Sequence, residues 1–191
     1  MEIIASGAEA VIALDGNTII KTRVNKRYRL KEIDETLRRE RTRTEARLIS
    51  EARRCGVPTP IIKDVTDFEI KMEYIDGEPL KNVITPELSE HAGEIVGKLH
   101  SCGLVHGDLT TSNIIFRDGK LFLIDFGLAY IDSTIEARGV DIHVLFQTFE
   151  STHECHEELI EAFKKGYSGR LPGADEVIKR VKEIESRGRY A

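Results

Sequence analysis

The feature that most constrains this 191-residue chain is the order and spacing of three oxygen-bearing side chains in its second half. Asp108 ends the tripeptide His-Gly-Asp, Asn113 follows five residues later, and Asp125 opens the tripeptide Asp-Phe-Gly. Apolar runs predict two short strands, Asn113 to Phe116 and Leu121 to Asp125. A hairpin made of these strands would bring Asn113 and Asp125 to one end of a small sheet, close to Asp108. The chain is therefore expected to fold so that the three groups converge.

These residue types in this order are typical of phosphoryl transfer. That chemistry needs a carboxylate near the attacking oxygen, here predicted to be Asp108. It also needs oxygen ligands for a magnesium ion that neutralises the phosphates, here predicted to be Asn113 and Asp125. The block HGDxxxxN, followed by LxLIDFG, has the spacing of a kinase catalytic loop and metal motif. Either tripeptide alone is a weak signal, whereas the ordered set is strong.

The first half supplies a candidate lysine and its acidic partner. Lys21 lies in the apolar run Thr18 to Val24, where a charged side chain needs an anion to meet. It matches the kinase lysine that holds the α- and β-phosphates of the nucleotide. Glu45, on the helix predicted from about Leu30 to Cys55, is the preferred partner. Glu40, one turn earlier and flanked by two arginines, is the competing choice.

Three further segments are predicted to contact a nucleotide or to hold the catalytic loop. A loop with one glycine, where kinase loops have three, could cover the phosphates with its backbone amides, although its glutamate adds negative charge there. Its residues are Gly7, Ala8, Glu9 and Ala10. The segment Met72 to Ile75 is predicted to be the hinge, with backbone groups of Glu73 and Ile75 bonding adenine, Met72 behind them and Ile115 as a further contact. A half-buried strand would give the same pattern. In kinases, an aspartate at the place of Asp141 anchors the backbone of the catalytic loop.

The coarse organisation is predicted to be α+β and bilobal. Residues 1–75 form a small β-rich lobe with one helix, and residues 76–191 form a reduced helical lobe, together making one kinase-like domain. The residues 76–79 are expected to be a linker. Helices are predicted from Thr85 to Ser101, Val140 to Phe149, Glu157 to Tyr167 and Asp175 to Ser186.

Composition points to a globular protein without a membrane partner. The chain is 40% hydrophobic and 32% charged, and no apolar run approaches the roughly 20 residues of a membrane helix. Its start lacks the pattern of a signal peptide. The three cysteines are far apart in the sequence and form no CxxC pair, which favours free thiols and a cytoplasmic location.

Positive charge is concentrated between residues 21 and 54, which hold 13 lysines or arginines against six acidic residues, on an otherwise acidic chain. Such a stretch indicates either a polyanionic or acidic partner, or a solvated helix face. Charge alone does not separate these two interpretations.

Several blocks of the sequence resemble the kinase subunit of the KEOPS (EKC) complex, a family that includes the eukaryotic p53-related protein kinase. They are Ser6–Ala10, Lys26–Arg29, Arg43–Arg47, His106–Asn113, Ile124–Leu128, Gly139–Asp141, Ser151–His153 and Arg187–Arg189. The resemblance covers essentially the whole chain. It implies an atypical serine/threonine kinase and ATPase that uses ATP and Mg²⁺. It also implies a Kae-type threonylcarbamoyl transferase and a small companion subunit as partners, and threonylcarbamoyladenosine formation in tRNA as the process. Arg187 and Arg189 would then form a tail that reaches a partner or the RNA.

Some residues depart from ordinary protein kinases. Position 107 is glycine instead of arginine, and position 110 is threonine instead of lysine. About twelve residues separate Gly127 from Val140, too few for a peptide-binding platform, so water or a docked partner is the expected acceptor. Two alternatives stay open: a small-molecule kinase related to aminoglycoside and choline kinases, and a nucleotide-binding switch with little turnover.

Overall fold

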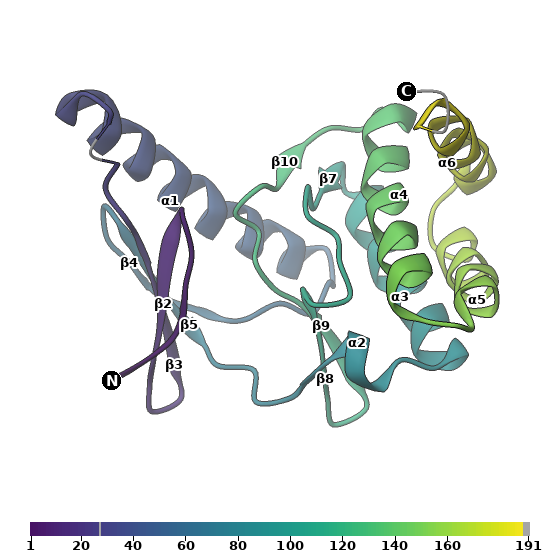
Figure 1. Cartoon of the computed structure of the whole chain (residues 1–191), viewed down its shortest axis with the longest axis horizontal. Helices are drawn as coiled ribbons and strands as arrows, with labels where there is room; N and C mark the ends of the chain where they lie inside the picture. The colour runs from purple at the N-terminus through teal and green to yellow at the C-terminus, as the bar shows by residue number, and fades with distance from the viewer. Residues whose placement is uncertain (27, 189–191) are drawn as a thin grey trace.

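The computed structural model describes residues 1–26 and 28–188, and its first half is built on an antiparallel sheet (Figure 1). Within the described part, the strands of this sheet follow the order β1-β2-β3-β5-β4. They span Glu2–Ser6 (β1), Ala10–Asp15 (β2), Thr18–Arg23 (β3), Ile62–Val65 (β4) and Glu69–Glu73 (β5). Strands β2 and β3 form a tight hairpin in which Asp15 pairs with Thr18. Gly16 has a φ of 58°, which a glycine adopts readily in such a turn.

Strand β1 is not predicted from the sequence. All five of its side chains are exposed, so the strand has no alternation of buried and exposed residues that a sequence pattern could reveal. Its position comes from backbone pairing with β2, in which Ser6 lies opposite Val11. This pairing holds the loop of residues 7–9 at one end of the sheet.

Helix α1 (Lys31–Arg54) connects the sheet with the rest of the molecule (Figure 1). It has acidic residues in its first turn and basic residues in its last, which complement the helix dipole. Ala46 packs against Ile70 of β5. Ile49 and Ala52 instead belong to the large hydrophobic cluster of the second half. One helix therefore shares its buried residues between both halves of the chain.

The second half is mostly helical, with short strands near the middle of the molecule (Figure 1). Its helices are α2 (Leu80–Val83), α3 (Pro86–Ser101), α4 (Ile135–Thr152), α5 (His156–Ser168) and α6 (Ala174–Gly188). Its strands are β6 (Glu78–Pro79), β7 (Leu104–Val105), β8 (Ile114–Arg117), β9 (Lys120–Leu123) and β10 (Tyr130–Ile131). Strands β6, β8 and β9 form one sheet, and β7 pairs with β10.

Several boundaries differ from the prediction. Two of the four residues expected to form a linker make strand β6, which pairs with β8, and the short elements α2 and β10 are not predicted. Helix α4 begins at Ile135, five residues before the predicted start, because the side chain of Thr134 accepts a hydrogen bond from the amide of Ala137 and caps the helix. Gly139, the residue before the predicted start, lies inside this helix.

Helices α3 and α5 approach each other closely because glycines lie at their contact. A Cβ atom on Gly93 would overlap the carbonyl oxygen of Phe163, and one on Gly166 would overlap that of Glu90. The hydroxyl of Ser89 donates a hydrogen bond to the carbonyl of Leu159 at 2.7 Å across the same contact. This packing fixes α3, the helix that leads directly into the segment of Asp108.

The described helices include none that combines the length and the apolar character needed to cross a bilayer. The boundary between residues 75 and 76 falls in the stretch between β5 and β6. The division into two lobes at that residue stays a prediction.

The expectation of three free thiols is wrong for two of the cysteines. Cys55, which follows α1, and Cys102, which follows α3, form a disulfide, whereas Cys155 is free and exposed. The pair is 47 residues apart in sequence and becomes adjacent only when α1 packs on the second half. Sequence spacing could not reveal it because the contact is tertiary.

We expect reduction of the Cys55–Cys102 bond to lower the free energy of unfolding by about 2–4 kcal/mol, because the bond closes a long loop and restricts the unfolded chain. Chemical denaturation with and without a thiol reductant measures this. The Cys155→Ala variant is the control and should keep the full difference between oxidised and reduced protein. Equal midpoints for the two forms would contradict the expectation.

Candidate active site

The β8–β9 hairpin brings Asn113 and Asp125 to one end of a small sheet. Ile114 pairs with Leu123, and the amide of Ile124 donates to the carbonyl of Asn113 at 3.0 Å. The side-chain amide of Asn113 donates to the carboxylate of Asp108 at 3.0 Å and to its backbone carbonyl at 2.9 Å. Asn113 thus holds Asp108 in place while its own side-chain oxygen remains an acceptor.

The buried carboxylate of Asp141, on α4, anchors the catalytic loop that begins at His106. This carboxylate accepts hydrogen bonds from the amides of His106 and Gly107, both at 2.9 Å. Gly107 has a φ of 79°, and a Cβ there would overlap the carbonyl oxygen of Leu128. The loop can therefore take this path only with glycine at position 107, and the arginine of ordinary protein kinases has no room here.

Two residues that the sequence did not single out extend this anchor. His100 of α3 bonds Asp141 through Nε2 at 3.1 Å and the hydroxyl of Tyr167 through Nδ1 at 2.8 Å, and all three side chains are buried. Burial opposes ionisation of Asp141, but the hydrogen bond and charge of His100, with the amides of the loop, hold the pKa of Asp141 below its usual value. Burial raises the pKa of the Tyr167 phenol. In the sequence, His100 and Tyr167 are only polar residues on predicted helices, and no motif marks them.

His106 is a third residue whose role comes only from the structure. Its Nε2 lies 3.0 Å from the carbonyl oxygen of Ile124, and its Nδ1 accepts from the amide of Asp108 at 3.3 Å. A carbonyl can only accept and an amide can only donate, so in these two hydrogen bonds Nε2 is the donor and Nδ1 the acceptor. Its ring also packs against Phe126 with 4.9 Å between centroids. His106 thereby connects the segments of Asp108 and Asp125.

Lys21 lies at the centre of a charge cluster between the two halves of the chain. Its Nζ is 2.6 Å from Glu45 and 2.7 Å from Asp125, and Glu45 also accepts from Arg23 at 2.5 Å. The partner of Lys21 on α1 is thus Glu45, whereas Glu40 is exposed. Burial alone would lower the pKa of Lys21, but the carboxylates of Glu45 and Asp125 raise it above its ordinary value.

Asp125 is held in an unusual backbone conformation beside this cluster. Its φ is 60°, in the left-handed region that is costly for a residue with a side chain, and Gly127 donates its amide to the Asp125 carboxylate at 3.3 Å. Burial would raise the pKa of Asp125, but the charge and hydrogen bond of Lys21 lower it below the usual value. The carboxylate is therefore ionised at neutral pH.

Oxygen atoms of Asn113 and Asp125 suit a hard divalent cation such as Mg²⁺. The described residues contain no group of three or more His, Cys, Asp or Glu side chains that could hold a metal by itself. An ion at Asn113 and Asp125 would need oxygen ligands from another source, and the phosphates of a nucleotide are such a source.

Two hollows meet at Lys21 and Asp125. One, of about 340 Å³, is mainly apolar and includes four of the predicted nucleotide contacts, Met72, Glu73, Ile75 and Ile115, together with Asn113. The amide of Glu73 already donates to Ile61, so any backbone bond from Glu73 to a ligand can involve only its carbonyl oxygen. The other hollow, of about 440 Å³, is lined by the predicted loop residues Gly7, Ala8, Glu9 and Ala10 together with Asp108. A ligand with a flat apolar end and an anionic end matches both.

The negative charge of Glu9 in the loop is neutralised locally. Its carboxylate is 3.1 Å from Lys26 and 2.8 Å from Arg41 of α1. The hydrogen bond from Lys26 lowers the pKa of Glu9, so the group is ionised. The loop of residues 7–10 is thus attached to α1 by the Glu9–Arg41 ion pair and to the segment before α1 by the Glu9–Lys26 ion pair.

The structure describes one of the two residues predicted for a basic tail. Arg187 was expected in a tail, but it lies in the last turn of α6, which runs to Gly188. The apolar pattern does not reveal this last turn because Ser186 and Arg187 are exposed polar residues. Arg189 lies outside the described residues.

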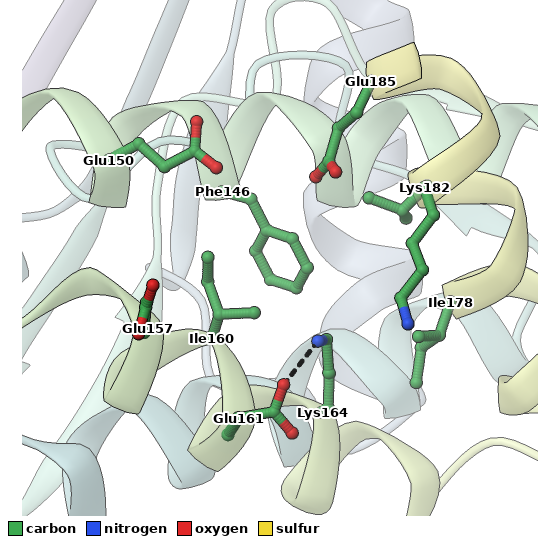
Figure 2. A pocket seen from close by; sticks show the side chains of 10 residues that line it. Phe146, Glu150, Glu157, Ile160, Glu161, Lys164, Ile178, Lys182 and Glu185 are labelled. Atoms are coloured by element: carbon green, nitrogen blue, oxygen red, sulfur yellow. Dashed lines mark hydrogen bonds and ion pairs between the residues drawn. The ribbon is translucent and has the colours of Figure 1, made fainter.

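A separate hollow of about 310 Å³ lies between α4, α5 and α6 (Figure 2). Phe146 and Ile160 line it, and Glu150 and Glu185 lie around it, while Lys164 donates to Glu161 at 2.6 Å (Figure 2). None of its lining residues belongs to the cluster of Asp108, Asn113 and Asp125.

Comparison with known proteins identifies the family. The RIO domain model matches residues 17–167. The chain is 47% identical to the probable serine/threonine-protein kinase BUD32 homolog of Archaeoglobus fulgidus, over 96% of this chain and 94% of that protein. It is 44% identical to the KEOPS complex subunit Bud32 of Pyrococcus abyssi, over 100% of this chain and 96% of that protein. The chain belongs to the Bud32 family of KEOPS kinase subunits. The predicted family is thus confirmed.

Other relatives are longer, and a solved structure confirms the fold. The chain is 62% identical to a probable bifunctional tRNA threonylcarbamoyladenosine biosynthesis protein of Methanosarcina acetivorans, matching 100% of this chain but spanning only 36% of that relative. The Rio2 kinase of Chaetomium thermophilum superposes with a TM-score of 0.67 at 16% identity, covering 100% of this chain and 72% of that one. The α+β protein-kinase-like fold predicted for this Bud32-family chain is therefore confirmed.

We expect Glu45→Ala to lower the free energy of unfolding by about 3–5 kcal/mol, because it leaves two buried cations without their shared carboxylate. Glu40→Ala, on the same helix, removes an exposed carboxylate and should cost no more than about 0.5 kcal/mol. Urea denaturation of both variants measures the difference. Similar losses for the two would contradict the assignment of Glu45 as the buried partner.

A second expectation concerns the catalytic loop. Gly107→Ala should displace the loop, because a Cβ at this positive φ has no space beside Leu128, and should reduce catalytic turnover by at least about tenfold. Gly119, in the β8–β9 turn, also has a positive φ but no atom within 4 Å of an added Cβ. Gly119→Ala is therefore the control for backbone strain without a clash. Equal activities of the two variants would contradict the expectation.

Proposed function

We propose that this chain is an ATP- and Mg²⁺-dependent phosphotransferase with serine/threonine protein kinase and ATPase activity. The observation that carries the proposal is the convergence of Asp108, Asn113 and Asp125 with the Lys21–Glu45 pair at two joined hollows. Its fold and its family are those of kinases, and the Rio2 structure of the same fold holds ADP and Mg²⁺.

Each residue has a distinct role in this proposal. The apolar hollow of Met72, Ile75 and Ile115 takes the adenine ring, and the loop of residues 7–10 covers the phosphates. Lys21 contacts the α- and β-phosphates, with Glu45 holding its side chain in place. Asn113 and Asp125 hold Mg²⁺, which supplies positive charge to the phosphate oxygens.

Asp108 is the proposed acceptor of the proton from the attacking hydroxyl or water. Its carboxylate is fixed by Asn113, and the two residues before it are held by hydrogen bonds from their amides to Asp141. Proton removal increases the nucleophilicity of the attacking oxygen as it approaches the terminal phosphate. The buried anchor is thus a positioning device that keeps Asp108 at a constant place.

The structure around the acceptor position favours water or a docked protein over diverse free peptides. Only residues 128–134 separate Gly127 from α4. The sequence predicted about twelve residues here, because it placed the start of the helix at Val140 instead of Ile135. Part of this segment is committed to β10, which pairs with β7. Little chain remains to bind an extended peptide, and Leu128, which lines the hollow of Asp108, is an exposed apolar side chain.

We further propose that the activity serves threonylcarbamoyladenosine formation in tRNA within a KEOPS complex. The names of the archaeal relatives support this role. A Kae-type threonylcarbamoyl transferase and a small companion subunit are the proposed partners, and tRNA is reached through the complex. A cytoplasmic location is part of the same proposal.

We expect Asp125→Ala to abolish binding of Mg²⁺-ATP because an anionic metal ligand is lost. Asp108→Asn should keep nucleotide affinity but reduce turnover by about 10²–10⁴-fold, the usual effect of removing a positioned acid–base group. Calorimetric titration and phosphate release measure the two effects. Asp118→Asn, on an exposed turn, is the control and should behave like the unaltered chain.

Unchanged Mg²⁺-ATP affinity in Asp125→Ala would contradict the metal site. Equal turnover by Asp108→Asn and the unaltered chain would contradict the catalytic role of Asp108. Phosphorylation of streptomycin or choline at the rate of ATP hydrolysis would instead favour a small-molecule kinase. Tight nucleotide binding without turnover, alone or with partners, would favour a switch.

A further inference from the structure

The hollow beneath the loop of residues 5–10 contains three cationic side chains, Lys21, Arg23 and Arg41, together with Asp108 and Asp125. Two of these cations, Lys21 and Arg23, already form ion pairs with buried or partly buried carboxylates. Lys21 is bonded to Glu45 and Asp125, and Arg23 is bonded to Glu45, and both are buried. Arg41 differs from them in both exposure and bonding.

Arg41 lies on α1 one turn before Glu45, and its side chain is 45% exposed. Within the described residues, its guanidinium makes one hydrogen bond, which Nη1 donates to the Glu9 carboxylate at 2.8 Å. A guanidinium has five N–H donors, so this contact leaves donors that can bind a further anion. Glu9 also pairs with Lys26 and would keep a cationic partner if Arg41 turned toward a ligand.

The chemistry of the site calls for such a group. During phosphoryl transfer, negative charge spreads over the three equatorial oxygens of the moving phosphate, and nearby cations stabilise it. Position 110, two residues after Asp108, is an uncharged threonine where protein kinases usually have a lysine. The cation missing from the catalytic loop can be replaced from α1, because Arg41 and Asp108 line the same hollow.

We propose that Arg41 is a catalytic residue that contacts the terminal phosphate of the bound nucleoside triphosphate. This inference rests on the proposed function and adds a residue to it. Glu9 holds the guanidinium over the phosphate position before the nucleotide enters. The ion pair between them also keeps the loop of residues 7–10 close to α1.

The step balances without any additional reactant. The oxygen of water or of a hydroxyl group forms a bond to the terminal phosphorus, and the bond from that phosphorus to the bridging oxygen breaks. The electron pair of the broken bond stays on the β-phosphate of the departing diphosphate, and the proton of the attacking oxygen goes to Asp108. Arg41 takes no part in the proton transfer and binds the equatorial oxygens more strongly as their charge grows.

The test compares Arg41→Gln with Arg43→Gln in the full chain. Arg43 lies on the same helix and pairs with Asp67, so its variant removes an equal charge outside the hollow. Affinities for Mg²⁺-ATP, Mg²⁺-ADP and AMP are measured by calorimetry, and turnover by phosphate release. Arg41→Gln should lower turnover by about 10²-fold, the usual effect of losing one preorganised donor, and should weaken ATP binding while leaving AMP binding unchanged. Arg43→Gln should match the unaltered chain.

A further variant separates direct contact from an effect on the loop. Glu9→Gln breaks the same ion pair but keeps the cation, so it should reduce turnover less than Arg41→Gln does. Arg41→Lys keeps a charge without the planar guanidinium and should recover part of the loss. Thermal unfolding midpoints of all variants should agree closely, since the Arg41–Glu9 pair is exposed.

The inference is overturned if Arg41→Gln hydrolyses ATP at the same rate as Arg43→Gln. It is equally overturned if Arg41→Gln lowers the affinity for AMP as much as the affinity for Mg²⁺-ATP. It is also overturned if Glu9→Gln reproduces the full loss, because the effect would then come from the loop. Each of these outcomes leaves the proposed function intact when Asp125→Ala still abolishes Mg²⁺-ATP binding. Failure of the unaltered chain to bind any nucleotide would overturn the function and the inference together.

Discussion

The buried carboxylate of Glu45 is the contact on which the relation between the two halves depends. An ionised carboxylate is costly to bury unless cations and hydrogen bonds replace its water, and here Lys21 and Arg23 do so. Lys21 in turn reaches Asp125, at the end of the β8–β9 hairpin. One charge cluster thereby joins the sheet, α1 and the segment that is expected to hold the metal. A shift of α1 would separate these groups and leave charges unpaired.

The C-terminal half of helix α1 is also fixed, by hydrophobic packing and by a disulfide. Ile49 and Ala52 are buried in the large hydrophobic cluster, and the Cys55–Cys102 bond ties the chain after α1 to the chain after α3. From α3 the chain leads through β7 into the catalytic loop, which Asp141 anchors through backbone amides. The residues of the sheet that line the apolar hollow and the carboxylates of the second half are thus attached to one continuous core, so their separation is set by packing.

Much of the site can be read from local sequence because its chemistry depends on spacing along the chain. Asp108, Asn113 and Asp125 lie on a loop and a hairpin, and a hairpin brings its two ends together whatever surrounds it. The sequence favoured Glu45 over Glu40 because Glu40 lies one turn earlier between two arginines, and in the structure Glu45 is one of the buried residues of α1. By contrast, β1 has no pattern to read, because its side chains are exposed.

What the sequence determined by itself is the kinase-like fold and the spacing of Asp108, Asn113 and Asp125, since both depend on short-range order and on residue type. Only the tertiary structure decided which distant groups meet. His100 and Tyr167 became part of the support of the catalytic loop, and Arg41 came to lie in the same hollow as Asp108. These contacts join residues on different elements. Their pairing depends on how helices and sheet pack in three dimensions, which no spacing along the chain encodes.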